Sequence, residues 1–223
     1  MTKSLTAALA LALLAGPARA DQLTLGSSAP VGNPIMFDAG TVSVPFIVFT
    51  TNNVNPDAPA NFMTAWQFNL VIVPGTGATG TVTFNTPATG TPAPPPNYVF
   101  GANGVGISAT NSGAMLSAND FHTAATGSQV PVAGANLLQM TALASANAQG
   151  PFGLFALQGA NNTLWTDAAA VPTTRFFVNV PAGTGMVQIG SFTVVPEPAL
   201  CLLAAAAAGL GAAAAARRRR RTG

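Results

Sequence analysis

Ala65-Trp66-Gln67-Phe68-Asn69-Leu70-Val71-Ile72-Val73 is the most regular stretch of the chain. Every second residue from Trp66 to Ile72 is apolar, whereas Gln67 and Asn69 between them are polar. This period of two places the apolar side chains on one face of a β-strand. The stretch therefore predicts a strand that lines a hydrophobic core, and it indicates an all-β fold.

The surrounding sequence supports this fold class. Residues 21–195 are rich in Thr, Val, Asn, Gly, Pro and Phe, and short apolar runs recur there between turn residues. This composition favours a single antiparallel β-sandwich of jelly-roll type with about nine strands. Besides 65–73, we expect strands within Thr41–Thr50, Thr79–Asn85, Tyr98–Ser108, Asn111–Leu116, Leu137–Ala146, Phe152–Gln158, Arg175–Val180 and Met186–Val195.

Three of these expectations are specific. In Thr41–Thr50, alternate residues from Val42 to Val48 should share one face, with Pro45 marking an edge or a bulge. Thr79–Asn85 should pair with the 65–73 strand across a Gly75–Gly80 hairpin connection. The leucines and alanines of Leu137–Ala146 suit a helix as well as a strand, and the strand is favoured.

The two ends of the chain differ in composition from the domain between them. At the N-terminus, Lys3 precedes a short apolar run, and Ala18-Arg19-Ala20 forms an A-x-A cleavage site. Residues 1–20 therefore predict a signal peptide cleaved after Ala20. At the C-terminus, the 18 apolar residues Ala199–Ala216 are long enough to span a bilayer as a helix.

Five arginines, Arg217, Arg218, Arg219, Arg220 and Arg221, follow the apolar run. By the positive-inside rule they should stay in the cytoplasm, which places residues 21–195 outside. The run is mostly alanine, so its membrane anchoring should be weak and transient. Before it, Pro196 and Pro198 hold Val195 and Glu197 extended, and Glu197 is the only glutamate of the chain.

Residues 196–223 resemble the PEP-CTERM sorting signal of bacterial exported proteins, because Pro196-Glu197-Pro198, the apolar span and the arginine cluster occur together at the end of the chain. The resemblance implies cleavage near the tripeptide by a membrane-embedded exosortase, a protease or transpeptidase. It implies a processed protein at the cell surface or in the extracellular matrix. An ordinary C-terminal membrane anchor is the alternative interpretation.

A second resemblance concerns the domain itself. The Trp66–Leu70 run W-Q-F-N-L, the order of features from Thr41 to Phe84 and the Gly- and Val-containing run before the tail are similar to the cohesin-type β-sandwich. This resemblance implies the fold, and it transfers no functional residue.

Charge excludes one class of partner. The chain's net charge of +2 comes from its ends, because residues 21–195 hold five aspartates and one arginine and carry a formal charge of −4. Nucleic-acid binding requires clustered Lys and Arg, so it is not expected. The only cysteine, Cys201, lies in the apolar run, so the domain should contain no disulfide.

The patterns that match catalytic or cofactor motifs lack the context that such motifs require. Gly75–Gly80 and Gly104–Ala109 match dinucleotide-binding glycine patterns, but neither leads into a helix, and both predict turns. His122, the only histidine, follows Asp120 at a distance of two residues and lacks the partners of a metal site or triad. We therefore expect no enzyme activity, no metal and no cofactor.

Three functions remain as hypotheses. The first is a structural or interaction role at the surface. The second is a carbohydrate-binding module for an extracellular polysaccharide, in which Trp165 stacks on a sugar while Asn162 and Asp167 donate or accept hydrogen bonds. In that hypothesis residues 161–167 form a polar loop; the alternative is that Trp165 closes one end of the sandwich. The third, an exported hydrolase, requires two convergent carboxylates.

Overall fold

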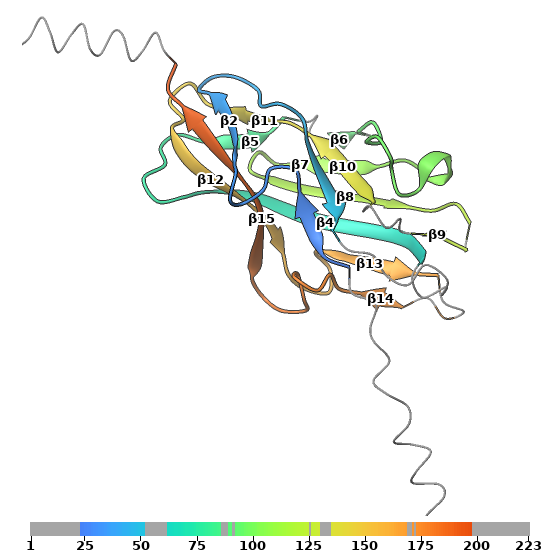
Figure 1. The fold of residues 1–223 in the computed structure, drawn as a ribbon. Coiled ribbons are helices and arrows are strands. Elements are labelled where there is room, and N and C mark those ends of the chain that lie inside the picture. The colour runs from blue at the N-terminus through green and yellow to red at the C-terminus, as the bar shows by residue number, and fades with distance from the viewer. Residues whose placement is uncertain are drawn as a thin grey trace, which may run out of the picture.

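A computed structural model describes residues 23–197, except 52–61, 86–88, 91, 125, 130–134, 169–170 and 172. The predicted signal peptide, Pro198, the apolar run and the arginine cluster lie outside these residues. No helix among the described residues is long and apolar enough to cross a membrane. The described chain forms two packed layers of β-sheet, as Figure 1 shows.

The described residues contain fifteen strands, several of them only two or three residues long. The first eight are β1 (Leu25–Ser27), β2 (Ile35–Asp38), β3 (Phe46–Thr50), β4 (Phe62–Pro74), β5 (Val82–Phe84), β6 (Thr89–Gly90), β7 (Ser108–Asn111) and β8 (Met115–Phe121). The others are β9 (Ser128–Gln129), β10 (Asn136–Met140), β11 (Ala142–Ala144), β12 (Gly150–Leu157), β13 (Leu164–Asp167), β14 (Thr174–Arg175) and β15 (Met186–Val195). A short 3₁₀ helix, η2, spans Gly101–Asn103.

One layer is a ten-stranded sheet with the order β2-β15-β12-β4-β8-β7-β6, in which β13 and β9 also pair with β4, and β14 pairs with β13. The other layer consists of the sheet β1-β3-β10 and the pair β11-β5. All pairings between the described strands are antiparallel except that of β2 with β15, and the isolated bridge between Tyr98 and Asn136 is also parallel. β2, the first strand of the ten-stranded sheet in chain order, therefore lies beside β15, the last of the described strands (Figure 1).

The 65–73 stretch forms the central part of β4, the longest described strand. Its apolar residues Trp66, Phe68, Leu70 and Ile72 are all buried, while the residues between them are partly exposed. Burial of each such side chain contributes about 1.5–3 kcal/mol. The period of two thus correctly predicted which face of this strand meets the core.

Aromatic side chains join the two layers. The ring of Phe192, on β15, lies 5.1 Å from that of Phe46, on β3, and 6.2 Å from that of Phe37, on β2. Within the long sheet, Trp66 and Phe68 stack at 4.6 Å. All except Phe37 are almost completely buried, so the domain core is continuous from one sheet to the other.

Several predicted strands are confirmed. Met186–Val195 has the expected bounds, Phe152–Gln158 corresponds to β12, and Leu137–Ala146 contains β10 and β11 rather than a helix. The all-β class is therefore confirmed.

The predicted hairpin between Ala65–Val73 and Thr79–Asn85 is wrong. Strand β5 pairs with β11 in the opposite layer, and β4 pairs instead with β8 and β12. Residues 75–80 carry the chain from β4 in the ten-stranded sheet to β5 in the other layer. Within this connection, Thr79 forms an isolated bridge with Gln149. Alternation specifies the buried face of a strand but not its neighbour, so the sequence left this pairing undetermined.

Three other segments are less regular than expected, the third being Arg175–Val180, where only Arg175 belongs to a strand and Phe177 bridges Val180 across a turn. In Thr41–Thr50 the strand begins only at Phe46, after Pro45, and Val42 and Val44 are exposed. In Tyr98–Ser108, η2 and turns replace the expected strands, since only Ser108 belongs to a strand. Pro45 lacks the backbone N–H that a ladder requires, which accounts for the first difference.

We predict that Gly80→Ala destabilises the domain more than Gly77→Ala does. Both glycines have positive φ angles, 68° and 78°, so each substitution should cost about 1–2 kcal/mol in backbone strain. At Gly80 a Cβ would also lie 2.6 Å from backbone atoms of Ala148, whereas nothing lies within 4 Å at Gly77. Urea denaturation should show the larger loss for Gly80→Ala. Equal losses of unfolding free energy in the two variants would contradict the close approach of Gly80 to the backbone of Ala148.

Candidate functional site

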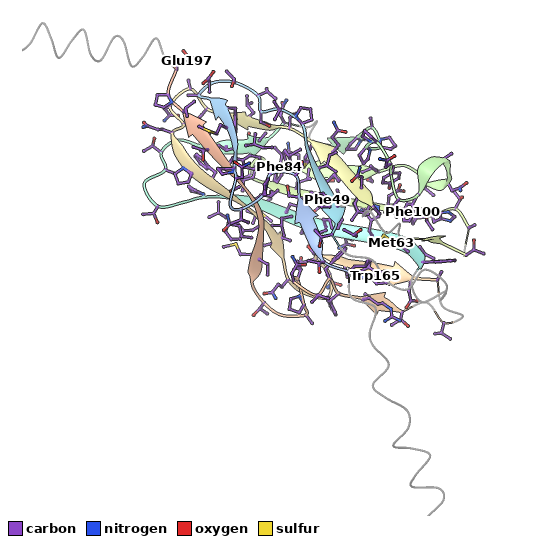
Figure 2. The ribbon with its side chains drawn as sticks, in the orientation of Figure 1. Phe49, Met63, Phe84, Phe100, Trp165 and Glu197 are labelled. Atoms are coloured by element: carbon purple, nitrogen blue, oxygen red, sulfur yellow. The ribbon has the colours of Figure 1, made fainter. Side chains whose placement is uncertain are left out.

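Trp165 lies in the core rather than on the surface. It belongs to β13, where it pairs with Trp66 of β4 on one side and with Arg175 of β14 on the other. Its side chain is completely buried (Figure 2). The polar loop expected at residues 161–167 therefore ends at Thr163, and Trp165 has no face on which a sugar ring can stack.

The other two predicted sugar contacts also have internal partners. Asp167 is fully buried and accepts hydrogen bonds from Arg175 Nε at 2.5 Å and from the Thr173 amide at 2.9 Å. The Arg175 guanidinium in turn lies 5.8 Å from the Trp165 ring centre. Asn162 Nδ2 donates to the carbonyl of Gln158, and Asn162 Oδ1 accepts from Asn69 Nδ2 at 2.8 Å. These residues hold the β12–β13 connection and β14 against β4.

A second buried carboxylate, Asp120, is the centre of a polar network that the sequence did not predict. Asp120 Oδ2 accepts a hydrogen bond from the Tyr98 hydroxyl at 2.5 Å, and that hydroxyl accepts from Trp66 Nε1 at 3.1 Å. Asp120 Oδ1 accepts from the amides of Gly106 at 3.0 Å and Phe121 at 2.8 Å. Four donors thus act on the network without any cation in contact with the carboxylate.

The network raises the pKa of Tyr98 far above its usual value near 10. Burial is the main cause, because it disfavours the phenolate, and the hydrogen bond and negative charge of Asp120 add to it. Tyr98 is the only tyrosine of the chain. It therefore acts as a neutral donor throughout the physiological pH range.

The glycine-rich stretch Gly104–Ala109 has a structural role in this network. Gly106 supplies one of the amides that bind Asp120, and a Cβ at Gly104 would lie 2.6 Å from Asp120 Oδ2. Small residues there allow the backbone to approach the carboxylate. In place of the expected turn or bulge, Gly104 bridges His122, residues 105–107 are irregular and β7 begins at Ser108. As expected, the stretch leads into no helix among the described residues.

His122 does not join Asp120. Its Nδ1 lies 2.9 Å from the carbonyl of Ala124, and its ring contacts that of Phe100 at 5.6 Å in an edge-on arrangement. Among the described residues, no three His, Cys, Asp or Glu side chains group as metal ligands would.

A shallow cavity of about 270 Å³ lies over β12, β15 and the end of β4. Pro34, Pro74, Pro151 and Phe155 contribute much of its apolar lining, and Gln188 is a polar residue at its edge. No lining residue is titratable. The cavity therefore offers no general acid or base.

The outward side of β7 and β8 forms an uncharged surface, here called the polar face, made of Ser108, Thr110, Ser117 and Asn119. All four are exposed, and they form two rows because Ser108 pairs with Asn119 and Thr110 with Ser117. Met115 at one end and Phe121 at the other are 47% and 52% exposed. Exposed hydroxyl and amide groups bordered by large apolar side chains provide both hydrogen-bonding groups and apolar contact area.

The C-terminal segment leaves the domain without a spacer. Val195 is the last residue of β15, and its carbonyl accepts a hydrogen bond from the Ala39 amide at 2.9 Å. Pro196 follows, and Glu197 is exposed at the end of the sandwich (Figure 2). The pairing of β15 with β2 thus fixes where the predicted sorting signal begins.

Comparison with known proteins gives a fold but no family. No protein-family model and no curated protein matches the chain. The chain is similar to a solved chain of a type II cohesin–X-dockerin complex of Acetivibrio cellulolyticus, an N-terminal interface mutant, at 10% identity with a TM-score of 0.50. The match covers 78% of this chain and 99% of that one.

The second type II cohesin module of the adaptor ScaA scaffoldin from the same organism is similar at 12% identity, also with a TM-score of 0.50. That match covers 80% of this chain and 92% of that chain. Both define the class of the domain as a cohesin-like β-sandwich, and they confirm the fold that the cohesin-type resemblance implied.

We predict that alkaline pH destabilises the domain through Tyr98. The pKa of Tyr98 is higher in the folded state than in the unfolded state, so its stabilising effect is present below about pH 10 and is lost as pH rises further. Thermal unfolding should show a fall in Tm above that pH, and phenolate absorbance should appear only on unfolding. Tyr98→Phe should lower Tm at neutral pH but lack the tyrosine-dependent fall. A phenolate signal from the folded protein near pH 10 would contradict the burial of this hydroxyl.

Proposed function

We propose that this chain is an exported, non-enzymatic protein of the cell surface or extracellular matrix. Its C-terminal Pro196-Glu197-Pro198 segment is the substrate of an exosortase-type membrane enzyme, and its β-sandwich binds a partner protein. The single observation that carries the proposal is the accessibility of Glu197, two residues beyond the last strand of a cohesin-like domain.

Accessibility matters because a processing enzyme must bind an extended, unpaired backbone in its cleft. Pro196 lacks a backbone N–H, and Pro198 disfavours the α conformation of Glu197. Glu197 is exposed and is the only glutamate of the chain. An enzyme that recognises an extended glutamate between prolines therefore has one candidate position.

The two ends of the chain indicate the order of export, membrane insertion and cleavage that we propose for this protein. Residues 1–20 direct export, the apolar run 199–216 crosses the membrane transiently, and Arg217–Arg221 remain in the cytoplasm. Cleavage near Pro196-Glu197-Pro198 then separates the domain from its anchor. The exosortase supplies the catalytic groups in this scheme, and this chain supplies the substrate.

The carboxylates of the domain favour a binding role over an exported hydrolase. A glycosidase needs two accessible carboxylates on either side of a scissile bond. Asp120 and Asp167 are both buried, and their oxygens are occupied by internal donors. The described part of the domain therefore has no cleft in which these two aspartates converge on a substrate.

A partner protein fits the domain better than a polysaccharide does. Trp165, the aromatic residue on which the carbohydrate hypothesis depended, is buried. One of the similar structures is a complex of a cohesin with an X-dockerin, which is a protein partner. We assign partner binding to the polar face of β7 and β8 on its own chemistry, because uncharged hydrogen-bonding rows lie there between the exposed side chains of Met115 and Phe121.

Glu197→Ala should leave export intact and block removal of the tail. The expected result is a mature protein that lacks residues 1–20 but retains Arg217–Arg221, measured by mass spectrometry of the cell-associated form. Glu197→Gln distinguishes charge from shape, because it keeps the side-chain length and removes only the carboxylate.

Asp38→Ala is the matched control for this experiment. Asp38 is an exposed carboxylate at the end of β2 and pairs in register with Val195, so its loss changes the charge at the same end of the domain. Tail removal should proceed normally in this variant. An intact arginine tail on the mature wild-type protein would refute the sorting hypothesis itself.

Asn119→Arg should reduce partner binding by roughly 5- to 150-fold, because it places a bulky charge on an uncharged face, which costs on the order of 1–3 kcal/mol. Binding would be measured by quantitative capture of proteins from the native extracellular fraction. Thr184→Arg, in the exposed turn before β15, adds the same charge away from the polar face and should have no effect. Equal capture by both variants would exclude the polar face as the binding surface.

A further inference from the structure

Three turns gather at the end of the sandwich from which the sorting segment leaves. They are Asp38–Thr41 after β2, Ala78–Thr81 before β5 and Ser145–Gln149 between β11 and β12. We call this set the C-terminal platform. In Figure 1 the tips of β2 and β15 lie together at this end of the molecule.

Hydrogen bonds connect the three turns into one surface. The Gly40 amide donates to the carbonyl of Ser145 at 3.1 Å, and the Ser145 amide donates to that of Thr81 at 2.9 Å. Thr79 and Gln149 exchange two backbone hydrogen bonds, at 2.9 and 3.0 Å. The platform is therefore held by backbone groups, independently of which side chains it exposes.

Glu197 rests against this platform. A Cβ added at Gly40 would lie 3.6 Å from Glu197 Oε1 and 3.7 Å from the Cα of Ala146. Glu197, the charged residue of the proposed sorting segment, thus lies over the Asp38–Thr41 turn, which adjoins the Ser145–Gln149 turn.

The tether between the platform and the apolar run is short. Ala199 is four residues after Val195, and a fully extended chain covers about 13–14 Å in that length. The headgroup region of a bilayer alone occupies about 5–7 Å on each side of the hydrocarbon. Glu197 itself rests on the platform, and the two residues from Glu197 to Ala199 extend about 7 Å, no further than the headgroup depth. When residues 199–216 cross a membrane and Glu197 keeps this contact, the platform therefore has no room to stand away from the membrane.

The side chains of the platform suit contact with lipid headgroups. Its exposed residues are Asp38, Gly40, Thr41, Thr79, Thr81, Ala146, Asn147 and Gln149, of which only Asp38 carries a charge. Val42 and Leu143, bridged to each other immediately beside these turns, are 46% and 38% exposed. Small polar groups with aliphatic side chains at their rim suit the zwitterionic headgroup boundary of a bilayer. An anionic lipid surface suits them less well, because it would repel the negative charges of Asp38 and Glu197.

We propose that, before the tail is cleaved, the C-terminal platform lies directly against the zwitterionic headgroup layer on the outer side of the membrane, with Val42 and Leu143 at its rim. This inference rests on the proposed function, because it requires the apolar run to span the membrane. It follows that Glu197 is held at headgroup depth, and that the processing enzyme reaches it from within the plane of the membrane.

The test uses the chain with its tail, in phosphatidylcholine vesicles, with Cys201→Ser so that one introduced cysteine carries an environment-sensitive fluorophore. Asn147→Cys labels the platform. Asn103→Cys labels an exposed residue of η2 beyond the far end of β8, about 20 Å further along the sheet. Spin-labelled headgroups should quench the label at residue 147 several-fold more strongly than the label at residue 103.

Equal quenching at the two positions in membrane-inserted protein would overturn the platform proposal. Extraction at alkaline pH identifies insertion separately. If the chain washes off the vesicles, the transmembrane role of residues 199–216 fails, and with it the proposed function. Circular dichroism confirms that both labelled variants are folded.

A second variant tests the role of the short tether. A flexible Gly/Ser linker of about 20 residues between Val195 and Pro196 extends the reach by roughly 25 Å. Quenching at residue 147 should then fall toward the value at residue 103. Unchanged quenching would overturn the conclusion that the four-residue spacing holds the platform on the membrane.

Discussion

Burial of the inward face of β4 is the interaction on which the rest of the structure depends. This strand pairs with β8 and β9 along one edge and with β12 and β13 along the other, so most of the long sheet is assembled on it. Its apolar side packs with side chains of the opposite layer, in a core without disulfides. Packing must therefore provide the stability that small exported domains often obtain from covalent links.

Buried polar groups are the complementary constraint, because a core of this kind tolerates a carboxylate only when its oxygens are satisfied. Two different solutions occur. Asp167 pairs with Arg175, the one base between residues 21 and 195. Asp120 forms no ion pair with a described residue and instead accepts from Tyr98 and two backbone amides. Both residues that looked like candidates for chemistry thereby serve to fix loops and short strands on β4.

The functional features accordingly lie at the surface of the domain. The polar face belongs to the ten-stranded sheet, and the proposed sorting segment leaves the fold at the C-terminal platform. The parallel pairing of β2 with β15 joins the beginning of the fold to its end, and it sets the point at which residues 196–197 leave the sheet. Folding of the sandwich and presentation of Glu197 are therefore parts of one arrangement.

The sequence alone determined the all-β class, the buried face of β4 and the bounds of β15, because each depends on local periodicity or composition. The export signal and the sorting segment stay predictions of the sequence. Only the tertiary structure decided that β5 crosses to the other layer, that Trp165 is buried beside Trp66, that Asp120 meets Tyr98, and that Glu197 lies against Gly40, in one of three turns joined by hydrogen bonds. The physical reason is that strand pairing and side-chain partnership join residues far apart in the chain, and alternation along a strand carries no information about which neighbour it will meet.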